Sequence, residues 1–412
     1  MSQINELIEK LCPNGVEWKK LGEVGTFFNG VIGKSKADFE NGNAKFISYM
    51  NVFSNPKLKI DVDDTIQINE GEKQHTLQYG DVIFTTSSET PNESGMSAVL
   101  TTKTEEKLYL NSFCFGFRFN NLDNINPDFY SYIFRSEPLR KQIVKCANGV
   151  TRFNISKENF VKVSIPVPPL EIQNRIVEIL DHFTNLTANL TAELNLRRKQ
   201  FEHYREKLLS LDGVEGVEWK TIGEECEIHG RIGWQGLTKK DYRSSGNYLL
   251  VTGTDFLSSC KINYNSCVYI DEDRYTQDKY IQLKENDLLI TKDGTIGKLA
   301  IVQDLPMPAT LNGGVFVIRN KTGNLYHKFL MYIMASSNFK NQIEQKHTNG
   351  TIKHLTQNLL ICYKIPVPPL DVQQSIVEKL DKFTALIENI EKELDLRQKQ
   401  YEFYREQLLS FN

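Results

Sequence analysis

The chain has no long hydrophobic run, no paired C-x-x-C cysteines and no large excess of charge of one sign. A membrane-spanning helix needs roughly 18 to 20 consecutive apolar residues, and no segment approaches that length. The opening segment does not resemble a signal peptide, because Glu6, Glu9 and Lys10 interrupt it. We therefore expect a cytoplasmic protein.

Cysteine and histidine are too few and too scattered to form a disulfide framework or a metal centre. The seven cysteines are Cys12, Cys114, Cys146, Cys226, Cys260, Cys267 and Cys362, an odd number that cannot all pair. Reduced thiols fit a cytoplasmic chain. His347 and His354 lack the spacing and the nearby thiol that a zinc site needs, so we expect no metal.

The charge balance excludes a strongly basic protein that binds nucleic acid without specificity. The 412 residues include 49 Lys and Arg against 52 Asp and Glu, a net charge of −3. Any positive patch must therefore be local. The length allows two or three domains, each with its own core.

An internal repeat dominates the sequence. The six residues IPVPPL occur at Ile165–Leu170 and again at Ile365–Leu370, and the charged segments that follow them match without a gap. The segments GVEWKKLGE, from Gly15, and GVEWKTIGE, from Gly216, match as well. The order is therefore domain, helix, domain, helix.

Each repeat begins with a region that is predicted to be rich in strands. GDVIFTT (80–86) and YLNSFCFGFRF (109–119) parallel NDLLITK (286–292) and TLNGGVFVIRN (310–320), and all are rich in Val, Ile, Phe and Thr. A helix is expected near 128–144 and another near 325–343. We predict domains at 1–165 and 212–365, with long helices at 166–211 and 366–412.

The proline box must be extended, because proline fixes its own φ and restricts the residue before it. A helix can begin at Pro169 or Pro369, where a missing N–H costs nothing. Apolar positions then alternate at spacings of four and three for about five heptads, which is typical of a coiled coil. The predicted seam comprises Ile176, Leu180, Phe183, Leu190, Leu194, Arg197, Phe201, Tyr204 and Leu208, and in the second copy Ile376, Leu380, Phe383, Ile387, Ile390, Leu394, Arg397, Tyr401, Tyr404 and Leu408.

Geometry predicts an antiparallel pairing of these two helices. A helix of this length extends about 60 Å, whereas a domain of this size has a radius of gyration of about 15 Å. The second domain can join the end of one helix to the start of the other only if the two run in opposite directions. The predicted fold class is α+β, with two β-rich domains separated by an intramolecular antiparallel coiled coil and related by a pseudo-two-fold axis.

The same features resemble the specificity subunit of type I restriction-modification systems. The likeness spans essentially the whole chain and includes IPVPPLEIQ, the helix end RKQFEHYREKLLSL, and the phrases RIGWQGLTKKDY, TKDGTIGK, NGVTRFNIS and NGTIKHLT. The resemblance implies a non-catalytic DNA reader in which each target-recognition domain recognises half of a bipartite, asymmetric site. The helices would set the spacer and hold two methyltransferase subunits, which endonuclease and translocase subunits join. S-adenosylmethionine, ATP and Mg²⁺ would be bound by those partners, with no cofactor bound by this chain.

Catalytic motifs are incomplete in the sequence. Pro168-Pro169 and Pro368-Pro369 lie between Val and Leu, unlike the Asn/Asp-Pro-Pro-aromatic box of an adenine methyltransferase. FNGVIGKS has Phe28 where a phosphate-binding loop needs its first glycine. Pro127-Asp128 has no carboxylate-x-Lys partner nearby, so it predicts a turn before a helix and not a nuclease site.

Contacts to DNA require basic and amide side chains on rigid loops. The regions before the proline boxes are the most basic, and the phosphate-contact candidates are Arg135, Arg140, Lys141, Lys145, Arg152, Lys340, Lys346 and Lys353. The base-reading candidates are Lys34, Ser87, Ser88, Glu89, Gln235, Lys239, Lys240, Lys292 and Lys298. Each of them could equally be a solvated surface residue.

Two alternatives stay open at the level of sequence. Arg197 and Arg397 either lie along the seam with their guanidinium groups in water or beside a Glu, or they set the register and anchor a partner. The chain as a whole could instead be a structural adaptor with two protein-binding heads, which its weak net charge favours.

Overall fold

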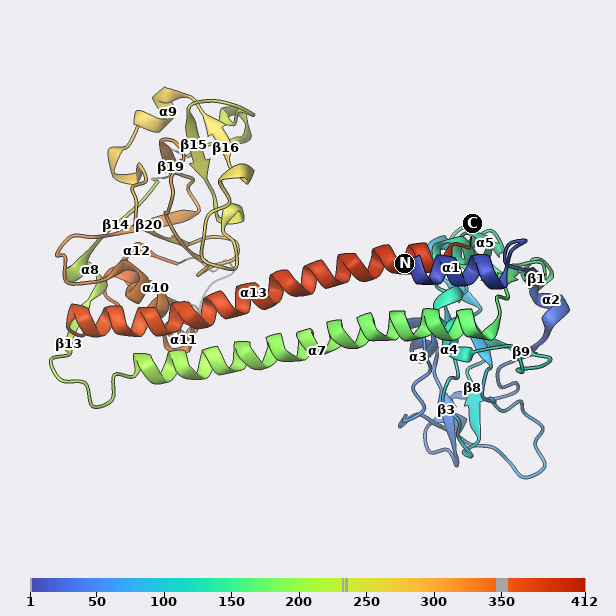
Figure 1. Cartoon of the computed structure of the whole chain (residues 1–412). Coiled ribbons are helices and arrows are strands. Elements are labelled where there is room, and N and C mark those ends of the chain that lie inside the picture. Colours follow the sequence, from blue (N-terminus) through green and yellow to red (C-terminus); the bar gives the residue numbers. More distant parts are fainter. Residues whose placement is uncertain (1, 232, 234–235, 346–354, 412) are drawn as a thin grey trace. The chain divides into compact units, whose positions relative to one another are not determined.

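The computed structural model describes residues 2–231, 233, 236–345 and 355–411. The chain divides into two compact units, one of residues 1–189 with 394–412 and the other of residues 190–393. Each unit contains a β-rich head and parts of both long helices (Figure 1). The unit boundaries cut through those helices, so they do not test the predicted limits of the heads, which stay predictions.

The first head is built on a four-stranded antiparallel sheet. Its order is β2 (Gly25–Asn29), β9 (Cys114–Phe119), β5 (Val82–Thr85) and β7 (Ser97–Val99). Successive side chains of β5 point to opposite faces, and both faces are buried. Phe84 packs with other aromatic rings on one face, while Ile83 packs with Ile47 and Ala98 in a separate cluster on the other.

Smaller sheets and short helices complete this head. The strands are β1 (Trp18–Lys20) with β12 (Ser164–Pro166); β4 (Thr65–Ile66), β3 (Ala44–Ile47) and β8 (Leu108–Leu110); and β10 (Ala147–Asn148), β11 (Phe153–Ile155) and β6 (Ser87–Ser88). Strands β3 and β8 run parallel. The helices are α1 (Ser2–Leu11), α2 (Leu21–Val24), η1 (Lys36–Phe39), α3 (Tyr49–Ser54), η2 (Pro91–Glu93), α4 (Pro127–Ile133), α5 (Glu137–Val144) and α6 (Lys157–Phe160).

The second head follows the same plan. Its main antiparallel sheet has the order β14 (Cys226–Gly230), β20 (Val315–Asn320), β17 (Leu288–Thr291) and β18 (Leu299–Ile301). The smaller sheets are β16 (Val268–Ile270), β15 (Tyr248–Val251) and β19 (Ala309–Leu311), and β13 (Glu218–Thr221) with β21 (Lys364–Val367). The helices are α8 (Ile222–Glu225), η4 (Lys239–Asp241), η5 (Gly253–Asp255), η6 (Tyr264–Ser266), α9 (Glu272–Thr276), η7 (Lys279–Ile281), α10 (His327–Ala335), α11 (Ser337–Gln345) and α12 (Gln357–Ile361).

Several segments expected to be continuous are divided. The run 109–119 contains the end of β8 and all of β9, separated by a turn in which Asn111 Oδ1 accepts a hydrogen bond from the Phe113 N–H. The helix expected near 128–144 is two helices, α4 and α5. The break falls at Ser136, whose hydroxyl donates to the Ile133 carbonyl, and the second helix begins at Glu137 with Pro138 in its first turn.

The two long helices are α7 (Leu170–Leu209) and α13 (Leu370–Leu409), each of 40 residues. In the first unit the start of α7 packs with the end of α13, and Phe183 stacks on Tyr404 with ring centroids 5.2 Å apart. In the second unit Tyr204 stacks on Phe383 at 5.3 Å, which is the same contact with the helices exchanged. The helices therefore pair antiparallel within each unit, as predicted.

Most predicted seam positions are covered. The buried positions are Ile176, Leu180, Leu194, Ile376, Leu380, Ile390 and Leu408. The half-buried positions are Phe183, Leu190, Arg197, Phe201, Leu208, Phe383, Ile387, Leu394, Arg397, Tyr401 and Tyr404. Tyr204 is exposed. Arg197 hydrogen-bonds Gln200 and Glu193 of its own helix, and Arg397 hydrogen-bonds Gln400. These contacts agree with the first of the two interpretations of the seam arginines.

The proline box joins each head to its helix. Ile165 pairs with Lys19 in the β1–β12 ladder and Ile365 pairs with Lys220 in the β13–β21 ladder, so both boxes are extended as expected. The helices begin at Leu170 and Leu370, one residue after the prolines at which a helix could start and four residues after the predicted segment limits of 166 and 366. No helix among the described residues is both long and apolar enough to cross a membrane.

Candidate DNA interface

A small sheet brings the end of the first basic region to the surface of the first head. Strand β11 pairs with β10 on one side and with β6 on the other, with Phe153 opposite Ser88 and Asn154 opposite Ser87. Gly149 in the intervening turn has a φ of +145°, and a Cβ there would lie 2.0 Å from the Arg152 carbonyl oxygen. Glycine is therefore required at this position, and the turn places Arg152 beside β6.

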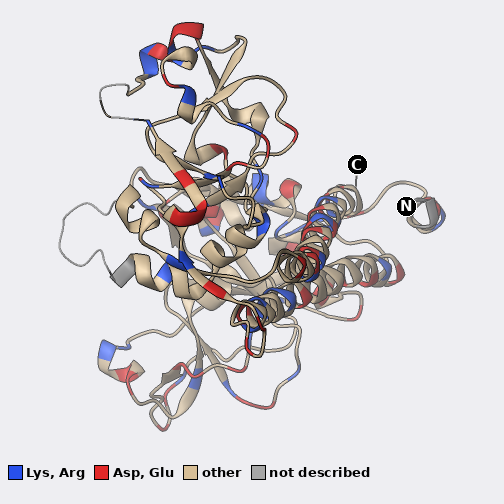
Figure 2. Cartoon of the chain, turned by 90° about the vertical axis from the view of Figure 1, so that its left-hand side faces the viewer, with Lys and Arg blue, Asp and Glu red and all other residues tan. Residues whose placement is uncertain are grey.

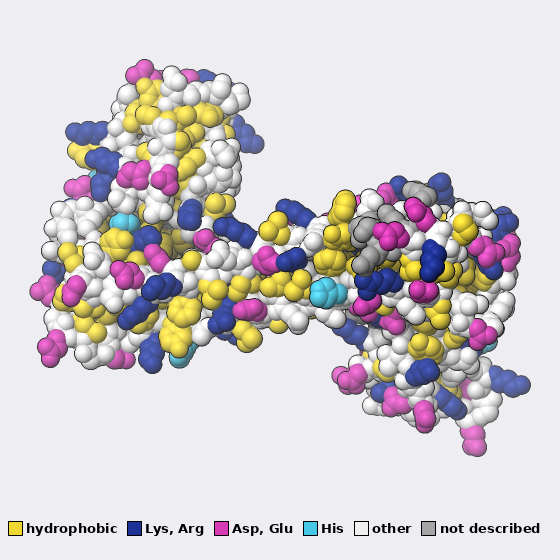
Figure 3. All heavy atoms as spheres, viewed as in Figure 1, with side chains coloured by type: hydrophobic (Ala, Val, Ile, Leu, Met, Phe, Trp, Pro, Cys, Tyr) yellow, Lys and Arg dark blue, Asp and Glu magenta, His cyan; other side chains and the backbone are white. Residues whose placement is uncertain are grey.

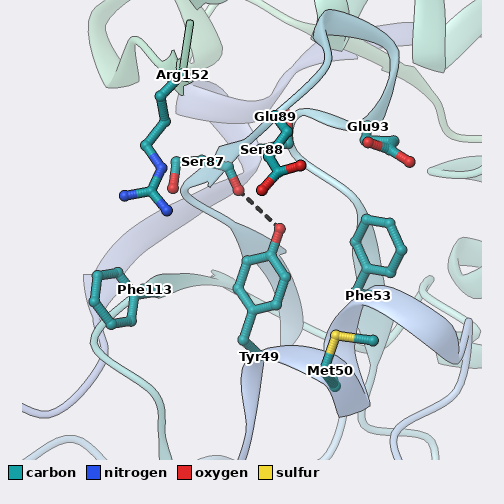
Figure 4. Close-up of a pocket in the computed structure, with 9 residues that line it drawn as sticks. All are labelled: Tyr49, Met50, Phe53, Ser87, Ser88, Glu89, Glu93, Phe113 and Arg152. Carbon is teal, nitrogen blue, oxygen red and sulfur yellow. Dashed lines mark hydrogen bonds between the residues drawn. The ribbon is translucent and has the colours of Figure 1, made fainter.

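Arg152 lines a pocket of about 350 Å³ in the first head (Figure 4). The other lining residues are Tyr49, Met50 and Phe53 from α3, Ser87, Ser88, Glu89 and Glu93 from β6 and the segment after it, and Phe113 from the turn before β9. The Tyr49 hydroxyl donates to the Ser87 carbonyl at 2.8 Å, which fixes α3 against β6. Burial raises the pKa of Tyr49, so the hydroxyl stays neutral at physiological pH.

The pocket combines exposed apolar surface with one guanidinium group, of Arg152, and two carboxylates, of Glu89 and Glu93. Met50 and Phe113 are 59% and 61% exposed, which is unusual for large hydrophobic side chains. Within the described part of the chain, no hydrogen bond or ion pair engages the Arg152 guanidinium or the Glu89 carboxylate. Glu93, in contrast, accepts a hydrogen bond from the Thr90 hydroxyl at 2.7 Å.

Two predicted phosphate-contact residues instead hold the walls of this pocket. Arg135 donates through Nη2 to the carbonyl oxygens of Val52, Phe53 and Asn55 at 2.9 to 3.0 Å, and so fixes the end of α3. Burial lowers the pKa of its guanidinium to about 10, so the group stays charged at neutral pH. The Nε and Nη2 donors of Arg135 are thus used inside the head, and its contact with a phosphate stays a prediction.

Arg140 has the corresponding role on the opposite wall. Its guanidinium donates to the carbonyl oxygens of Asn92, Ser94 and Gly95 at 2.6 to 2.9 Å, which fixes the segment after Glu89. The phosphate contact of Arg140 likewise stays a prediction. Lys141 and Lys145 are exposed on the outer side of α5, with Lys141 paired to Glu137 at 2.6 Å.

The base-reading candidates of the first head have different surroundings. Lys34 has a side chain only 5% exposed, and its ammonium is 2.6 Å from Glu72, whose pKa this pairing lowers to about 2. The charge of Lys34 is therefore paired within the head, and its contact with a base stays a prediction. Ser88 is buried and hydrogen-bonded to Ser94, whereas Ser87 is half-buried and Glu89 is exposed at the pocket.

The candidates of the second head lie at several places. Lys298 and Lys340 line one pocket of about 440 Å³, which brings a base candidate and a phosphate candidate together. Lys239 and Lys240 are exposed in η4. Lys292 is half-buried, with its ammonium 4.9 Å from the centre of the Phe316 ring. Gln235, Lys346 and Lys353 fall outside the described residues.

Charged groups are otherwise interspersed. Figure 2 shows Lys and Arg alternating with Asp and Glu along the long helices, and Figure 3 shows both signs mixed over the visible face of each unit. Among the described residues, no three His, Cys, Asp or Glu side chains gather as a metal site would require. The basic groups are therefore local and stand among acidic ones.

Residues 13–196 and 215–396 match the family model for the type I restriction modification DNA specificity domain. The chain belongs to this family. Each of the two matches covers a β-rich head and most of the helix that follows it, so the repeat is one of whole specificity domains. The resemblance stated from the sequence is confirmed.

Named relatives are specificity subunits. A type I restriction enzyme specificity subunit of Escherichia coli is 35% identical over 267 residues, which cover 62% of this chain and 65% of the relative. One from Methanocaldococcus jannaschii is 26% identical over 281 residues, which cover 64% of this chain and 65% of the relative. The chain thus aligns with slightly less than two thirds of the length of these specificity subunits.

Solved structures share the fold of this specificity-domain protein over nearly its whole length. The S subunit of a type I restriction-modification system from M. genitalium has a TM-score of 0.55 at 14% identity, covering 96% of both chains. A chain from a structure on complex assembly and conformational transition of the type I R-M system has a TM-score of 0.59 at 19% identity, covering 96% of this chain and 97% of that one. At these identities the similarity establishes the fold.

The sequence analysis missed the aromatic lining of the pocket in the first specificity domain. Tyr49, Phe53 and Phe113 are distant in the sequence and belong to no motif. A signal was nevertheless available in the aligned strands, where Phe113 of YLNSFCF corresponds to Gly314 of TLNGGVF. A large exposed aromatic residue in one repeat and a glycine in the other marks a place where the two heads differ in surface and not in core.

The long helices of this specificity-domain protein also carry exposed apolar side chains outside the seam. Leu196 is 67% exposed and Leu396 is 61% exposed, and the two occupy the same place in the repeat. Phe403, one heptad after Leu396, is 57% exposed. These are single exposed side chains, and the equal places of Leu196 and Leu396 in the repeat are the feature that sets them apart from other exposed apolar residues.

Proposed function

We propose that this chain is a non-catalytic DNA-specificity subunit of a type I restriction-modification complex. The observation that supports this best is the duplicated specificity domain, in which each copy joins a head to a long helix through the same proline box. The two heads share a strand arrangement but differ in their loops. Each head would therefore recognise a different half of a bipartite and asymmetric DNA site.

The loop differences support the asymmetry. In the first head a pocket with aromatic and charged lining includes Arg152, while the second head has glycine at the position of Phe113 and basic side chains at Lys298 and Lys340. Surfaces that differ in this way should prefer different base sequences. The proposed DNA-contact set is accordingly Arg152, Ser87 and Glu89 with the exposed Lys141 and Lys145 in the first head, and Lys239, Lys240, Lys292, Lys298 and Lys340 in the second.

The antiparallel helices have two proposed roles, as a spacer between the heads and as a docking surface for partner subunits. We propose that they hold the two heads a fixed distance apart and dock two methyltransferase subunits, one at Leu196 and one at Leu396. The equal places of these residues in the repeat favour two copies of one partner. Endonuclease and translocase subunits would complete the complex.

The chemistry is proposed to reside in those partners. S-adenosylmethionine would serve methyl transfer in the methyltransferase subunits, and ATP and Mg²⁺ would serve the endonuclease and translocase subunits. The family assignment also supports a cytoplasmic location, where the DNA substrate is found.

The test is selection of bound duplexes from a random-sequence pool, with and without a co-expressed methyltransferase subunit. Enrichment of two short motifs separated by a fixed gap is expected. Absence of any enriched sequence, even with the partner present, would contradict the proposal and favour an adaptor that joins proteins. A salt titration of the selected duplex provides the control, because phosphate contacts weaken as salt rises.

A further inference from the structure

We propose that Arg152 and Glu89 together recognise one G·C base pair of the half-site bound by the first head. This inference rests on the proposed function, since it names what the pocket of that head contacts. Arg152 is assigned to the guanine and Glu89 to the cytosine. The pocket is the candidate recognition site, and Phe113 and Met50 form its apolar rim.

The two charged groups project into one space from different elements. Arg152 comes from the turn between β10 and β11, and Glu89 comes from the segment that follows β6 (Figure 4). Because β6 and β11 are paired in one small sheet, their relative position is fixed by backbone hydrogen bonds. The backbone therefore presents one donor group and one acceptor group to the same space, which selective recognition of a base pair requires.

Hydrogen bonds from three side chains hold the segments that form the pocket. Arg135 binds the carbonyl end of α3, and Arg140 binds the carbonyl groups of the segment after Glu89. Tyr49 joins α3 to β6 through the Ser87 carbonyl. The Arg152 and Glu89 side chains are thus available to a ligand, while the segments that carry them are held in place. Because these segments are already ordered, little conformational entropy is lost when a ligand binds.

Charge argues against a phosphate as the occupant. Glu89 and Glu93 line the same pocket as Arg152, and two carboxylates would repel the negative backbone of DNA. A base-pair edge is neutral and offers both acceptors and a donor in the major groove. Guanine presents O6 and N7, which accept from an arginine, and cytosine presents the N4 amino group, which donates to a glutamate.

The apolar rim formed by Met50 and Phe113 also fits the edge of a DNA base pair. Met50 and Phe113 are exposed to solvent in the chain alone, and a thymine methyl group next to the recognised pair would cover part of them. The second head lacks this rim, since Gly314 stands where the first head has Phe113. The inference therefore concerns one half-site only, which provides an internal control.

The experiment compares sequences selected by the complex containing wild-type chain with those selected by Arg152→Ala, Glu89→Gln and Phe113→Gly variants. The expected result is a G·C pair at one position of one half-site in the wild-type motif, with preference there falling roughly 5- to 150-fold in the first two variants. The other half-site should keep its motif. Phe113→Gly should reduce the preference at a neighbouring position.

A Lys107→Ala variant is the matched control, since Lys107 is basic and exposed on the same head, does not line the pocket and is not in the proposed DNA-contact set. It should leave every base preference unchanged. Thermal melting of each variant checks that the exposed substitutions do not unfold the head. A uniform loss of affinity in Arg152→Ala, with an unchanged motif and a smaller salt slope, would show a phosphate contact and overturn the inference. A wild-type chain that enriches no split motif would instead refute the proposed function.

Discussion

Gln373 and Tyr326 are joined by a hydrogen bond of 2.8 Å from the Tyr326 backbone N–H to the Gln373 Oε1 atom. The Nε2 group of the same glutamine donates to the carbonyl oxygens of Asn324 and Pro368, each at 2.8 Å. Gln173 makes the same three bonds in the first unit, and both glutamines are fully buried. One side chain therefore ties the proline box, the head and the long helix together in each unit.

Replacing Gln373 with alanine should destabilise the second unit by about 2 to 4 kcal/mol, because three backbone groups lose their partner and the fully buried side chain leaves a cavity. Urea unfolding of the full chain measures the change. Gln374→Ala is the control, since Gln374 is the next residue of the same helix but is exposed, and it should change stability by less than about 0.5 kcal/mol. Equal effects of the two substitutions would contradict the structural role of Gln373.

Arg135 offers a second test of a buried polar anchor. Arg135→Ala removes the donors to Ser97, Val52, Phe53 and Asn55, so it should cost about 2 to 4 kcal/mol of stability and loosen α3. Hydrogen exchange at α3 measures the loosening. Lys141→Ala, an exposed basic substitution nearby, should leave both quantities nearly unchanged. If Arg135→Ala weakened DNA binding while stability and exchange at α3 stayed constant, the residue would be a phosphate contact after all.

The features predicted correctly are those that depend on neighbours in the sequence. The extended IPVPP segment follows from proline geometry, and the long helices follow from a heptad pattern that runs without interruption. Their antiparallel pairing follows from helix length and domain size alone. Within each unit the structure contains this pairing, through Phe183 with Tyr404 and Tyr204 with Phe383.

The pocket could not be predicted because its residues meet only through tertiary structure. The residues Tyr49, Glu89, Phe113 and Arg152 come from four separate segments. The β11–β6 pairing that brings two of these segments together joins a three-residue strand to a two-residue strand, and neither strand has a strong sequence pattern. The same limit explains Arg135, Arg140 and Lys34. Whether an exposed-looking basic residue finds carbonyl groups or a glutamate nearby depends on loops that fold against it from elsewhere in the chain.

Leu196 and Leu396 provide a test of partner docking. Leu196→Asp with Leu396→Asp should abolish co-purification of the methyltransferase subunit, since a charge at the centre of an apolar contact leaves a desolvated carboxylate. Each single variant should retain one partner copy, which the mass of the complex measures. Asn195→Asp is the control on the adjacent exposed position and should keep both copies. Full assembly of the double variant would exclude these residues from the docking surface.

The spacing role of the helices predicts a change in the length of the DNA gap. Duplicating one heptad in α7 and one at the matching place in α13 keeps the seam in phase and adds about 10 Å to each helix. At 3.4 Å per base pair, the gap between the two selected motifs should grow by about three base pairs. Each half-site should keep its own sequence, because neither head is altered.

The control for this prediction duplicates the heptad in α7 alone. The two helices then differ in length by two turns, so contacts such as Phe183 with Tyr404 and Tyr204 with Phe383 can no longer form together in one register. That variant should lose stability and sequence selection. A paired insertion that left the gap unchanged would mean that partner subunits, and not the helices, set the distance between the half-sites.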